Sequence, residues 1–254
     1  MRLVKALVRK PSPKLENGLL THMTRQGVDA DLALAQWEAY GDILRDWAEV
    51  IEVEPAPHQA DSVFIEDTAV VYGDTAVIAK PRFPSRQPET VAVEQTLREQ
   101  GLKIKHLADW GYLEGGDILK YDGTIWAGLS TRTDLDGLDW LKRGLSAYEP
   151  TVVTVPMQHA LNLKSAVSAL PDGTFIAHPK AAPPESYFPG YRRALEPQGS
   201  RVLILDGETI LMSETATETA AMLKAEGFNV ITTAMTELEK CEGGVTSLSI
   251  RIRE

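Results

Sequence analysis

Cysteine, long hydrophobic runs and positive charge are all scarce in this sequence. The single cysteine, Cys241, excludes an internal disulfide framework and every zinc or iron–sulfur site built from several cysteines. The longest uncharged apolar stretches run about six to eight residues, whereas a helix that crosses a bilayer needs roughly 20. A formal net charge of -10 argues against a phosphate-backbone partner. We therefore expect a cytoplasmic protein with no membrane or nucleic-acid partner, and the acidic balance weakly favours a cationic ligand.

The remaining composition is that of an ordinary globular protein. Hydrophobic residues make up 43% and charged residues 24% of the 254 positions, which is enough apolar material for a core. A chain of this length can form one large domain, and two domains are possible but not required. We predict a single domain over residues 1–254.

Four similar turns divide the chain. Each pairs a glycine with an acidic residue between two β-rich runs, and the glycines are Gly73, Gly123, Gly173 and Gly207. Such a pair favours a tight hairpin turn, because a positive φ costs glycine little. The first three glycines are spaced by 50 residues and the last follows after 34. The sequence therefore predicts a series of hairpins, in modules of varying length.

Helices and single strands lie between the hairpins. Helices are predicted over residues 31–50, 89–100, 134–148 and 213–226. Apolar residues recur at helical spacing in the first of them, and Gly101 and Gly227 close the second and the fourth. Single strands are predicted over residues 102–107, 151–156 and 228–234.

Repeats of this kind stack or close into a ring, because no unit can bury its apolar face alone. The first strand, residues 3–8, and the last, residues 246–252, can then complete one module together. The sequence predicts an α/β fold, a five-bladed α/β propeller of pseudo-symmetric ββαβ modules around a central site.

Polar residues gather in three short segments, 61–67, 113–117 and 242–247. Glu66 and Asp67 adjoin within a segment predicted to be an apolar strand, where buried carboxylates are costly unless a cation or hydrogen-bond donors match them. Two interpretations stay open. Both carboxylates face a pocket for a positive ligand, or one lies in solvent while the other pairs with an arginine.

Three further charged residues also allow a functional and a structural interpretation. Glu114 precedes a Gly-Gly pair, so it is either a ligand or a turn carboxylate. Arg86 and Arg132 follow second hairpin strands, where a guanidinium can bind a carboxylate through two hydrogen bonds or simply lie in solvent.

Taken together and in order, these segments resemble the dimethylarginine dimethylaminohydrolases of the guanidine-modifying superfamily. The likeness covers essentially the whole chain. It rests on the segments NGL at 17–19, DSVFIED at 61–67, PSR at 84–86, LEGGDIL at 113–119, TRT at 131–133, LNLKS at 161–165 and CEGGVTSLSIRI at 241–252. The family's fold is a five-bladed α/β propeller, which agrees with the interpretation of the repeats.

The resemblance implies hydrolysis of Nω-methylated arginine to citrulline and a methylamine, without metal or organic cofactor. In the family a thiolate attacks the guanidinium carbon, and a histidine protonates the departing amine and then activates water. Carried over to this chain, Asp67 and Glu66 hold the guanidinium in a pocket shaped by Phe64, and Glu114 orients the acid–base residue. The tail of the substrate and the lid of the pocket involve Asp61 for the α-amine, Arg86 and Arg132 for the carboxylate, and Leu19 in the lid.

Two positions depart from the family pattern. The motif that ends in a nucleophilic cysteine, Gly-Gly-Val-Thr-Cys, here ends in Ser247, and the family's His-Leu-Lys-Ser begins with Asn162. A serine hydroxyl is largely un-ionised near neutrality, and asparagine cannot transfer a proton. The sequence predicts that nucleophile and acid–base residue are both missing.

Other residues are poor substitutes by their position in the sequence. Cys241 lies six residues before Ser247, about 20 Å away along an extended strand. His159 is three residues from Asn162 and points to the opposite face of a strand. His22 in the lid is a better candidate. The remaining histidines share no metal-ligand spacing and are interpreted as structural: His58, His106 and His178.

Three hypotheses follow. The chain is a methylarginine hydrolase whose catalytic pair was replaced by engineering to trap a ligand, a natural non-catalytic relative that binds arginine-like molecules, or a hydrolase of arginine or another guanidine. All three imply a small-molecule partner, arginine or methylated arginine. The sequence leaves open whether the protein is a monomer or a homodimer.

Overall fold

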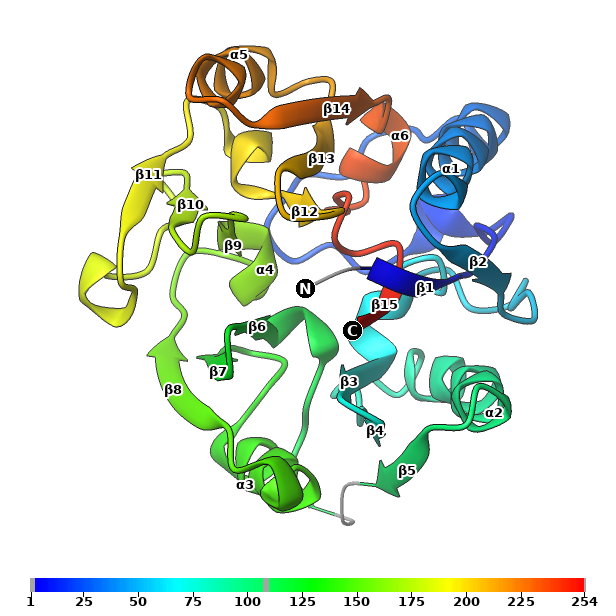
Figure 1. Cartoon of the computed structure of the whole chain (residues 1–254). Coiled ribbons are helices and arrows are strands. Elements are labelled where there is room, and N and C mark those ends of the chain that lie inside the picture. Colours follow the sequence, from blue (N-terminus) through cyan, green and yellow to red (C-terminus); the bar gives the residue numbers. More distant parts are fainter. Residues whose placement is uncertain (1–2, 107–109, 254) are drawn as a thin grey trace.

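The computed structural model describes residues 3–106 and 110–253. Within these residues, five three-stranded sheets surround a common centre, and most helices cover the outside of the ring (Figure 1). One strand of each sheet lies near the centre and another at the periphery. This arrangement confirms the predicted α/β fold of five modules in a propeller-like ring.

Three modules have the predicted ββαβ order. In the first, β3 (Ala69–Tyr72) pairs antiparallel with β4 (Thr75–Ile78), and α2 (Thr90–Glu99) leads to β5 (Lys103–His106), which is parallel to β4. Leu107, the last residue of that predicted strand, lies outside the described residues. The other two modules comprise β6 (Ile118–Tyr121), β7 (Thr124–Leu129), α3 (Leu135–Gly144) and β8 (Thr151–Pro156), then β12 (Leu203–Ile204), β13 (Thr209–Ser213), α5 (Thr217–Ala225) and β14 (Asn229–Thr233).

The two other modules vary this order. Strands β9 (Val167–Ala169), β10 (Phe175–Ala177) and β11 (Tyr191–Arg193) form a sheet in which only a 3-10 helix, η6 (Glu185–Tyr187), separates β10 from β11. The last module joins both ends of the chain. Its C-terminal strand β15 (Ile250–Arg253) pairs antiparallel with β1 (Leu3–Val8), which α1 (Ala30–Arg45) connects to the parallel strand β2 (Glu49–Glu52), and this closure confirms the prediction.

The turns and helix ends refine the sequence prediction. Gly73, Gly123 and Gly173 have φ values of 55°, 73° and 84°, as hairpin turns require, whereas Gly207 is not in this region. The helix predicted over 31–50 stops at Arg45, because residues 49–52 pair with β1 as a strand. Likewise, the helix predicted from residue 213 begins at Thr217, because Ser213 ends β13.

The core clusters fill the modules and also join neighbouring modules. One cluster joins Leu7 of β1 to Val71 of β3 and Leu97 of α2, and all three side chains are buried. Each module thus buries part of its apolar surface against its neighbours. Across residues 3–106 and 110–253, no helix has both the length and the apolar character needed to cross a membrane.

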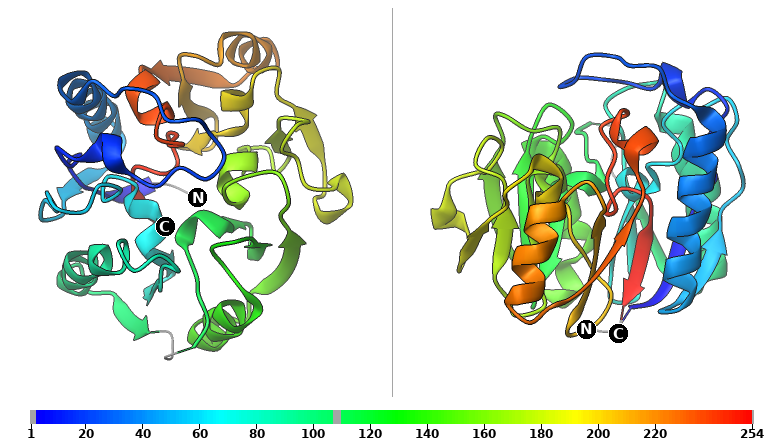
Figure 2. Two further views of the ribbon diagram at one scale, coloured as in Figure 1. Left: turned by 180° about the vertical axis from the view of Figure 1, so that it is seen from behind. Right: turned by 90° about the horizontal axis from the view of Figure 1, so that it is seen from above.

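Short segments just before the inner strands meet at the centre of the ring. They are η2 (Ile65–Thr68) before β3, η4 (Gly115–Asp117) before β6, α4 (Leu163–Ala166) before β9, and residues 244–249 before β15. Contacts join η2 to η4 and η4 to α4. We call these four segments the central layer. On one side of it a long loop, residues 18–28, crosses the end of the ring (Figure 2).

Candidate active site

Glu66 and Asp67 lie in the 3-10 helix η2, so the predicted strand over these two residues is wrong. The central layer packs η2 against η4, and this close packing needs Gly115, where a Cβ would lie 2.1 Å from the Glu66 carbonyl oxygen. The tight helical turn sends the two neighbouring carboxylates to opposite sides of the central layer. Asp67 faces the side covered by the long loop, and Glu66 faces a second cavity described below.

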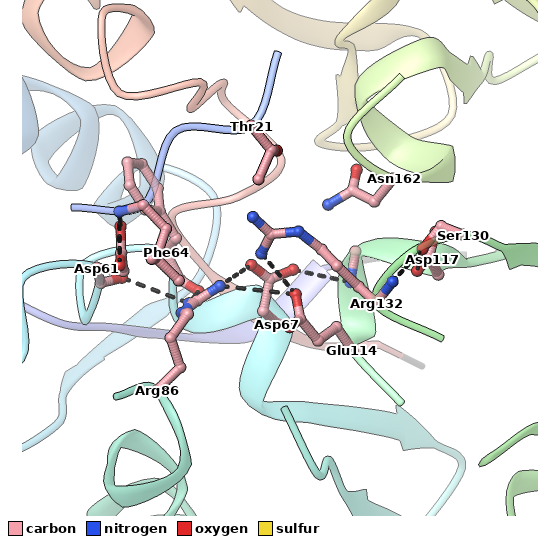
Figure 3. A network of polar contacts seen from close by, with 12 residues as sticks. Thr21, Asp61, Phe64, Asp67, Arg86, Glu114, Asp117, Ser130, Arg132 and Asn162 are labelled. Carbon is pink, nitrogen blue, oxygen red and sulfur yellow. Dashed lines mark hydrogen bonds and ion pairs between the residues drawn. The ribbon is translucent and has the colours of Figure 1, made fainter. Parts of the chain in front are cut away.

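A pocket on the loop side gathers eight of the ten residues that the sequence nominated. We call it the lid-side pocket, and its walls include Leu19, Asp61, Phe64, Asp67, Arg86, Arg132, Asn162 and Ser247. Glu114 is fully buried at its edge and contacts both arginines, whereas Glu66 does not line it. Figure 3 shows how several of these side chains converge from separate modules: Asp61, Phe64, Asp67, Arg86, Glu114, Arg132 and Asn162.

The charges of the lid-side pocket are paired with one another. Arg86 Nη1 lies 2.8 Å from Asp67 Oδ2, Arg86 Nη2 lies 2.9 Å from Glu89 Oε2, and Arg132 Nη1 lies 2.8 Å from Glu114 Oε2. Burial by itself lowers the pKa of Arg86, but the carboxylates of Glu89 and Asp67 outweigh it and raise that pKa well above the usual value. Arg86 therefore stays charged.

Glu114 has an unsatisfied oxygen. Its Oε2 accepts from Arg132, while its Oε1 is buried without a hydrogen-bond partner among the described residues. Burial raises the pKa of Glu114, the nearby Asp67 charge adds to the effect, and Arg86 and Arg132 oppose it. A buried acceptor left unpaired costs free energy, so this oxygen can gain from a donor that a ligand supplies.

Asn162 enters the pocket from the start of α4. It caps this helix: its Oδ1 accepts from the Ser165 N–H at 2.9 Å, and Ser165 Oγ accepts from the Asn162 N–H at 3.2 Å. The amide nitrogen of Asn162 and Asp67 Oδ1 both approach Gly116, where a Cβ would lie only 2.1 Å and 2.5 Å from them. Glycine at this position therefore lets the two functional groups come together.

Asp117, which the sequence analysis did not nominate, fixes the backbone next to Asn162. Its Oδ1 accepts from the Leu163 N–H at 3.0 Å, and its Oδ2 accepts from Ser130 Oγ at 2.6 Å. Complete burial raises the pKa of Asp117 to about 7. The only sequence signal for Asp117 is its place at the end of the segment Glu114-Gly115-Gly116-Asp117.

Two carboxylates hold the long loop closed over the pocket. Both oxygens of Asp61 accept from the Leu19 N–H at 3.1 Å, so Asp61 here binds the lid rather than being free for a ligand amine. Glu242, which sequence reasoning missed, accepts from the Thr21 N–H at 3.1 Å and from the His22 N–H at 2.5 Å. The His22 side chain is exposed, and no histidine is among the residues that line the pocket.

Cys241 also lines the lid-side pocket, so the inference that it lies far from Ser247 is wrong. Residues 236–247 do not form an extended strand. They comprise the short helix α6 (Thr236–Glu239) and a series of turns, which bring the ends of the segment together. The Cys241 thiol donates to the Leu15 carbonyl at 3.8 Å, and burial raises its pKa to about 11. It is therefore a poor source of thiolate near neutrality.

The pocket is closed in this structure. Its volume is about 20 Å³, which is room for about one water molecule. A larger ligand can enter only when the lid opens and the arginine side chains move. Within the described part of the chain, no group of three or more His, Cys, Asp or Glu side chains is arranged to hold a metal ion.

The fold and this pocket define a class of five-module, propeller-like α/β enzymes. One similar solved structure is a Cys-to-Ser mutant of the dimethylarginine dimethylaminohydrolase from Pseudomonas aeruginosa complexed with citrulline, with a TM-score of 0.91, 25% identity, and coverage of 99% of this chain and 100% of that one. A His-to-Gly mutant dimethylarginine dimethylaminohydrolase, an adduct with S-methyl-L-thiocitrulline, has the same fold, with a TM-score of 0.90, 24% identity, and coverage of 98% and 100%.

Sequence comparison narrows the class to a family. The family model for eukaryotic N,N dimethylarginine dimethylhydrolase matches residues 21–165. The N(G),N(G)-dimethylarginine dimethylaminohydrolase of Streptomyces coelicolor is 42% identical over 252 residues, which are 98% of this chain and 97% of that protein. This chain belongs to the dimethylarginine dimethylaminohydrolase family.

Proposed function

We propose that the lid-side pocket binds arginine or its Nω-methylated forms, and that the parent reaction is hydrolysis of methylated arginine to citrulline and a methylamine. Ser247 and Asn162 stand at the nucleophile and acid–base positions, so the present chain binds but turns over slowly. The observation that carries the proposal is the deeply buried Glu114 beside Asp67. Its Oε1 is an acceptor with no partner among the described residues, and its Oε2 lies 2.8 Å from Arg132 Nη1 and 3.7 Å from Arg86 Nη1.

Binding is an exchange of partners. In the closed pocket, the guanidinium group of Arg86 pairs with Asp67 and that of Arg132 pairs with Glu114. A ligand guanidinium is planar, cationic and rich in N–H donors, so it can take over these carboxylates through the same paired hydrogen bonds. Arg86 and Arg132 are then free to bind the ligand carboxylate, and Asp61 can exchange the Leu19 N–H for the ligand ammonium.

Such an exchange keeps every buried charge paired at each end of the ligand. Removing an arginine from its carboxylate without a replacement would leave a buried charge uncompensated, which costs several kcal/mol. A ligand that is cationic at one end and zwitterionic at the other avoids this cost. The same argument rejects ligands without a guanidinium, because Asp67 and Glu114 would lose their partners.

The chemistry of the reacting centre explains the slow turnover. Attack on a guanidinium carbon needs an ionised nucleophile and an acid to protonate the leaving amine. Ser247 offers an un-ionised hydroxyl. Asn162, whose Oδ1 is committed to the α4 cap, offers an amide that holds its protons. The pocket therefore keeps its binding groups and lacks both reactive groups.

The test restores the two reactive groups. We would measure citrulline release and arginine or dimethylarginine affinity for the chain itself, for Ser247→Cys, for Asn162→His and for the double variant. The double variant is expected to raise turnover at least ~10³-fold, and each single variant far less, because residues that act as a unit are not additive. The matched control is Cys241→Ser, which removes the other thiol of the pocket and is expected to leave the double variant active.

Each other outcome has a definite meaning. If the double variant binds but stays inert, the chain is a non-catalytic arginine-binding relative. If it hydrolyses arginine faster than dimethylarginine, the substrate assignment is wrong. If Cys241→Ser abolishes turnover in the double variant, Cys241 rather than position 247 supplies the nucleophile. Absence of any affinity for arginine compounds would overturn the proposal entirely.

A further inference from the structure

A second and much larger cavity occupies the other side of the central layer. It runs along the inner strands to the hairpin turns at Gly73, Gly123 and Gly207, and it has a volume of about 690 Å³. We call it the turn-side cavity. This volume falls in the range of small-molecule sites, about 300–1,000 Å³, whereas the lid-side pocket does not. The proposed hydrolase function does not use this cavity.

Cations outnumber carboxylates in its interior. Four basic side chains from three elements line it: Lys120 of β6, Lys164 of α4, and Arg251 and Arg253 of β15. The one carboxylate of the central layer that lines it is Glu66, which lies 2.7 Å from Lys164 Nζ and also pairs with Arg251. Glu66 thus forms ion pairs with both Lys164 and Arg251, although its single negative charge neutralises only one of them.

The remaining two cations have no carboxylate partner within the described residues. Lys120 Nζ donates to the Val71 carbonyl, and Arg253 Nη2 donates to the Ile204 carbonyl at 2.5 Å. Two more acidic residues line the cavity, but both lie on hairpin turns: Asp122 is exposed, and Asp206 accepts from the N–H groups of Glu208 and Thr209 in its own turn. Neither Asp122 nor Asp206 forms an ion pair with Lys120 or Arg253.

The excess of positive over negative charge in this cavity is energetically costly. Burial lowers the pKa of Lys120 to about 7, with further lowering by Lys164, Arg251 and Arg253 that Glu66 only partly opposes. Burial also lowers the pKa of Arg253 to about 9, and Arg251 adds to the effect. Lys120 and Arg253 are half-buried. Charges withdrawn from water are normally matched by an opposite charge, so two half-buried cations without a carboxylate partner in a roomy cavity indicate a ligand that brings two negative charges.

We propose that the turn-side cavity binds a small organic dianion whose charges lie on oxygen, a dicarboxylate or a phosphate monoester, through Lys120 and Arg253. The guanidinium of Arg253 suits a carboxylate or phosphate through paired hydrogen bonds, and the ammonium of Lys120 acts as a point charge. Apolar residues of the inner strands, including Val71, Leu119 and Ile250, face the body of the ligand.

Binding of the dianion also requires that Lys120 be protonated. Several titratable and charged groups line the cavity around Lys120: Glu66 from η2, Lys164 from α4, Tyr72 from β3, Tyr121 from β6, Arg251 and Arg253 from β15, and Asp122 and Asp206 from two turns. Because cations predominate near Lys120, its ammonium group loses a proton easily, and a dianion beside it would favour the protonated form. Affinity is therefore expected to fall as the pH rises above neutrality.

The test measures binding of two probes, inorganic phosphate and succinate, by titration calorimetry and by the shift of the melting temperature. Each probe is compared with sodium chloride at equal ionic strength. Both the dicarboxylate and the phosphate group are expected to bind with a Kd in the micromolar to low millimolar range, and tighter binding of one identifies the natural head group. Succinate affinity is expected to fall at least ~5-fold between about pH 6.5 and about pH 8.5.

Two variants locate the site. Lys120→Met and Arg253→Met each remove one cation and are expected to weaken succinate binding about tenfold or more, the loss of one charge-assisted hydrogen bond. The matched control is Lys142→Met, which removes an exposed lysine on the outer helix α3 and is expected to leave binding unchanged.

Two results would overturn the proposal. One is that neither probe binds beyond the chloride control. The other is that both cavity variants bind succinate as tightly as the Lys142→Met control, because the dianion then binds elsewhere. Arginine affinity of the lid-side pocket is measured on the same samples, so failure of this proposal is distinguishable from failure of the proposed function.

Discussion

The lid-side pocket and the turn-side cavity share the central layer as a common wall, yet they treat charge in opposite ways. In the pocket, Arg86 and Arg132 are matched by Asp67, Glu89 and Glu114, and the space between them closes to about 20 Å³. In the cavity, Lys120 and Arg253 lack carboxylates among the described residues, and about 690 Å³ stays open.

The difference shows how a ring of modules controls where ligands bind. Opposite charges that face one another form ion pairs and close the space between them, so a ligand can bind only by replacing one partner of each pair. Like charges that face one another hold a space open, so a ligand must neutralise them. Removing a cation should therefore destabilise the protein on one side of the central layer and stabilise it on the other.

The largest expected effect is on the lid side. Arg86→Met leaves the buried carboxylates of Asp67 and Glu89 unpaired and should lower the free energy of unfolding by ~3–5 kcal/mol, measured by urea denaturation. The matched control is Arg82→Met, whose partner Asp134 is at 3.1 Å in a partly exposed pair, and which should cost under ~1 kcal/mol. Equal costs for the two variants would mean that the charges of the pocket are not matched as described.

The central layer itself should titrate. The pKa of Asp117 is raised to about 7 in the folded protein, above its unfolded value of about 3.9, so the folded state binds more protons between these values. Stability should then fall by up to ~4 kcal/mol as the pH rises from about 4 to about 7. Asp117→Asn, which resembles the protonated acid, should flatten that part of the pH profile, and an unchanged slope would assign it to other groups.

The turn side should respond with the opposite sign to the lid side. Lys120→Met removes a half-buried cation that has no carboxylate partner among the described residues, and it should raise the free energy of unfolding by ~1–2 kcal/mol at about pH 6 in chloride buffer. The lowered pKa of Lys120 means that the wild-type protein itself gains stability as the pH rises above about 7, and this gain should be absent from the variant. A destabilised variant would show that Lys120 is matched in the folded state.

The smallest expected effect concerns the lid. Glu242→Gln removes the negative charge that accepts from the Thr21 and His22 N–H groups and should weaken lid closure by about 1 kcal/mol. Limited trypsin cleavage at Arg25, in the exposed loop, should become about fivefold faster. Glu208→Gln, an exposed turn variant, is the control and should cleave at the unchanged rate.

Sequence reasoning located most of the site because the site residues belong to short segments that repeat before the inner strands. Eight of the ten nominated residues line the lid-side pocket, and Glu114 lies against its arginines. Glu66 was assigned to the wrong side. Adjacent side chains point in different directions both in a strand and in a 3-10 helix, so the position of Asp67 did not fix that of Glu66. Only the packing of η2 on η4 selected the 3-10 helix.

Cys241 was misplaced for a related reason. Its distance from Ser247 was judged from an extended chain, whereas α6 and the turns after it fold that segment back on itself. Asp117 was missed because its partner, the Leu163 N–H, is 46 residues away in the sequence. Contacts of this kind leave no trace in local composition.

The amino-acid sequence by itself determined the number and order of the modules, since glycine turns and the periodicity of apolar residues act over a few neighbouring positions. Closure of the ring decided the rest. Only when β15 pairs with β1 do the central segments face one another, so that charges far apart in the chain either neutralise one another, as in the lid-side pocket, or remain unmatched, as in the turn-side cavity. Electrostatic matching depends on distances in space, and those exist only in the folded ring.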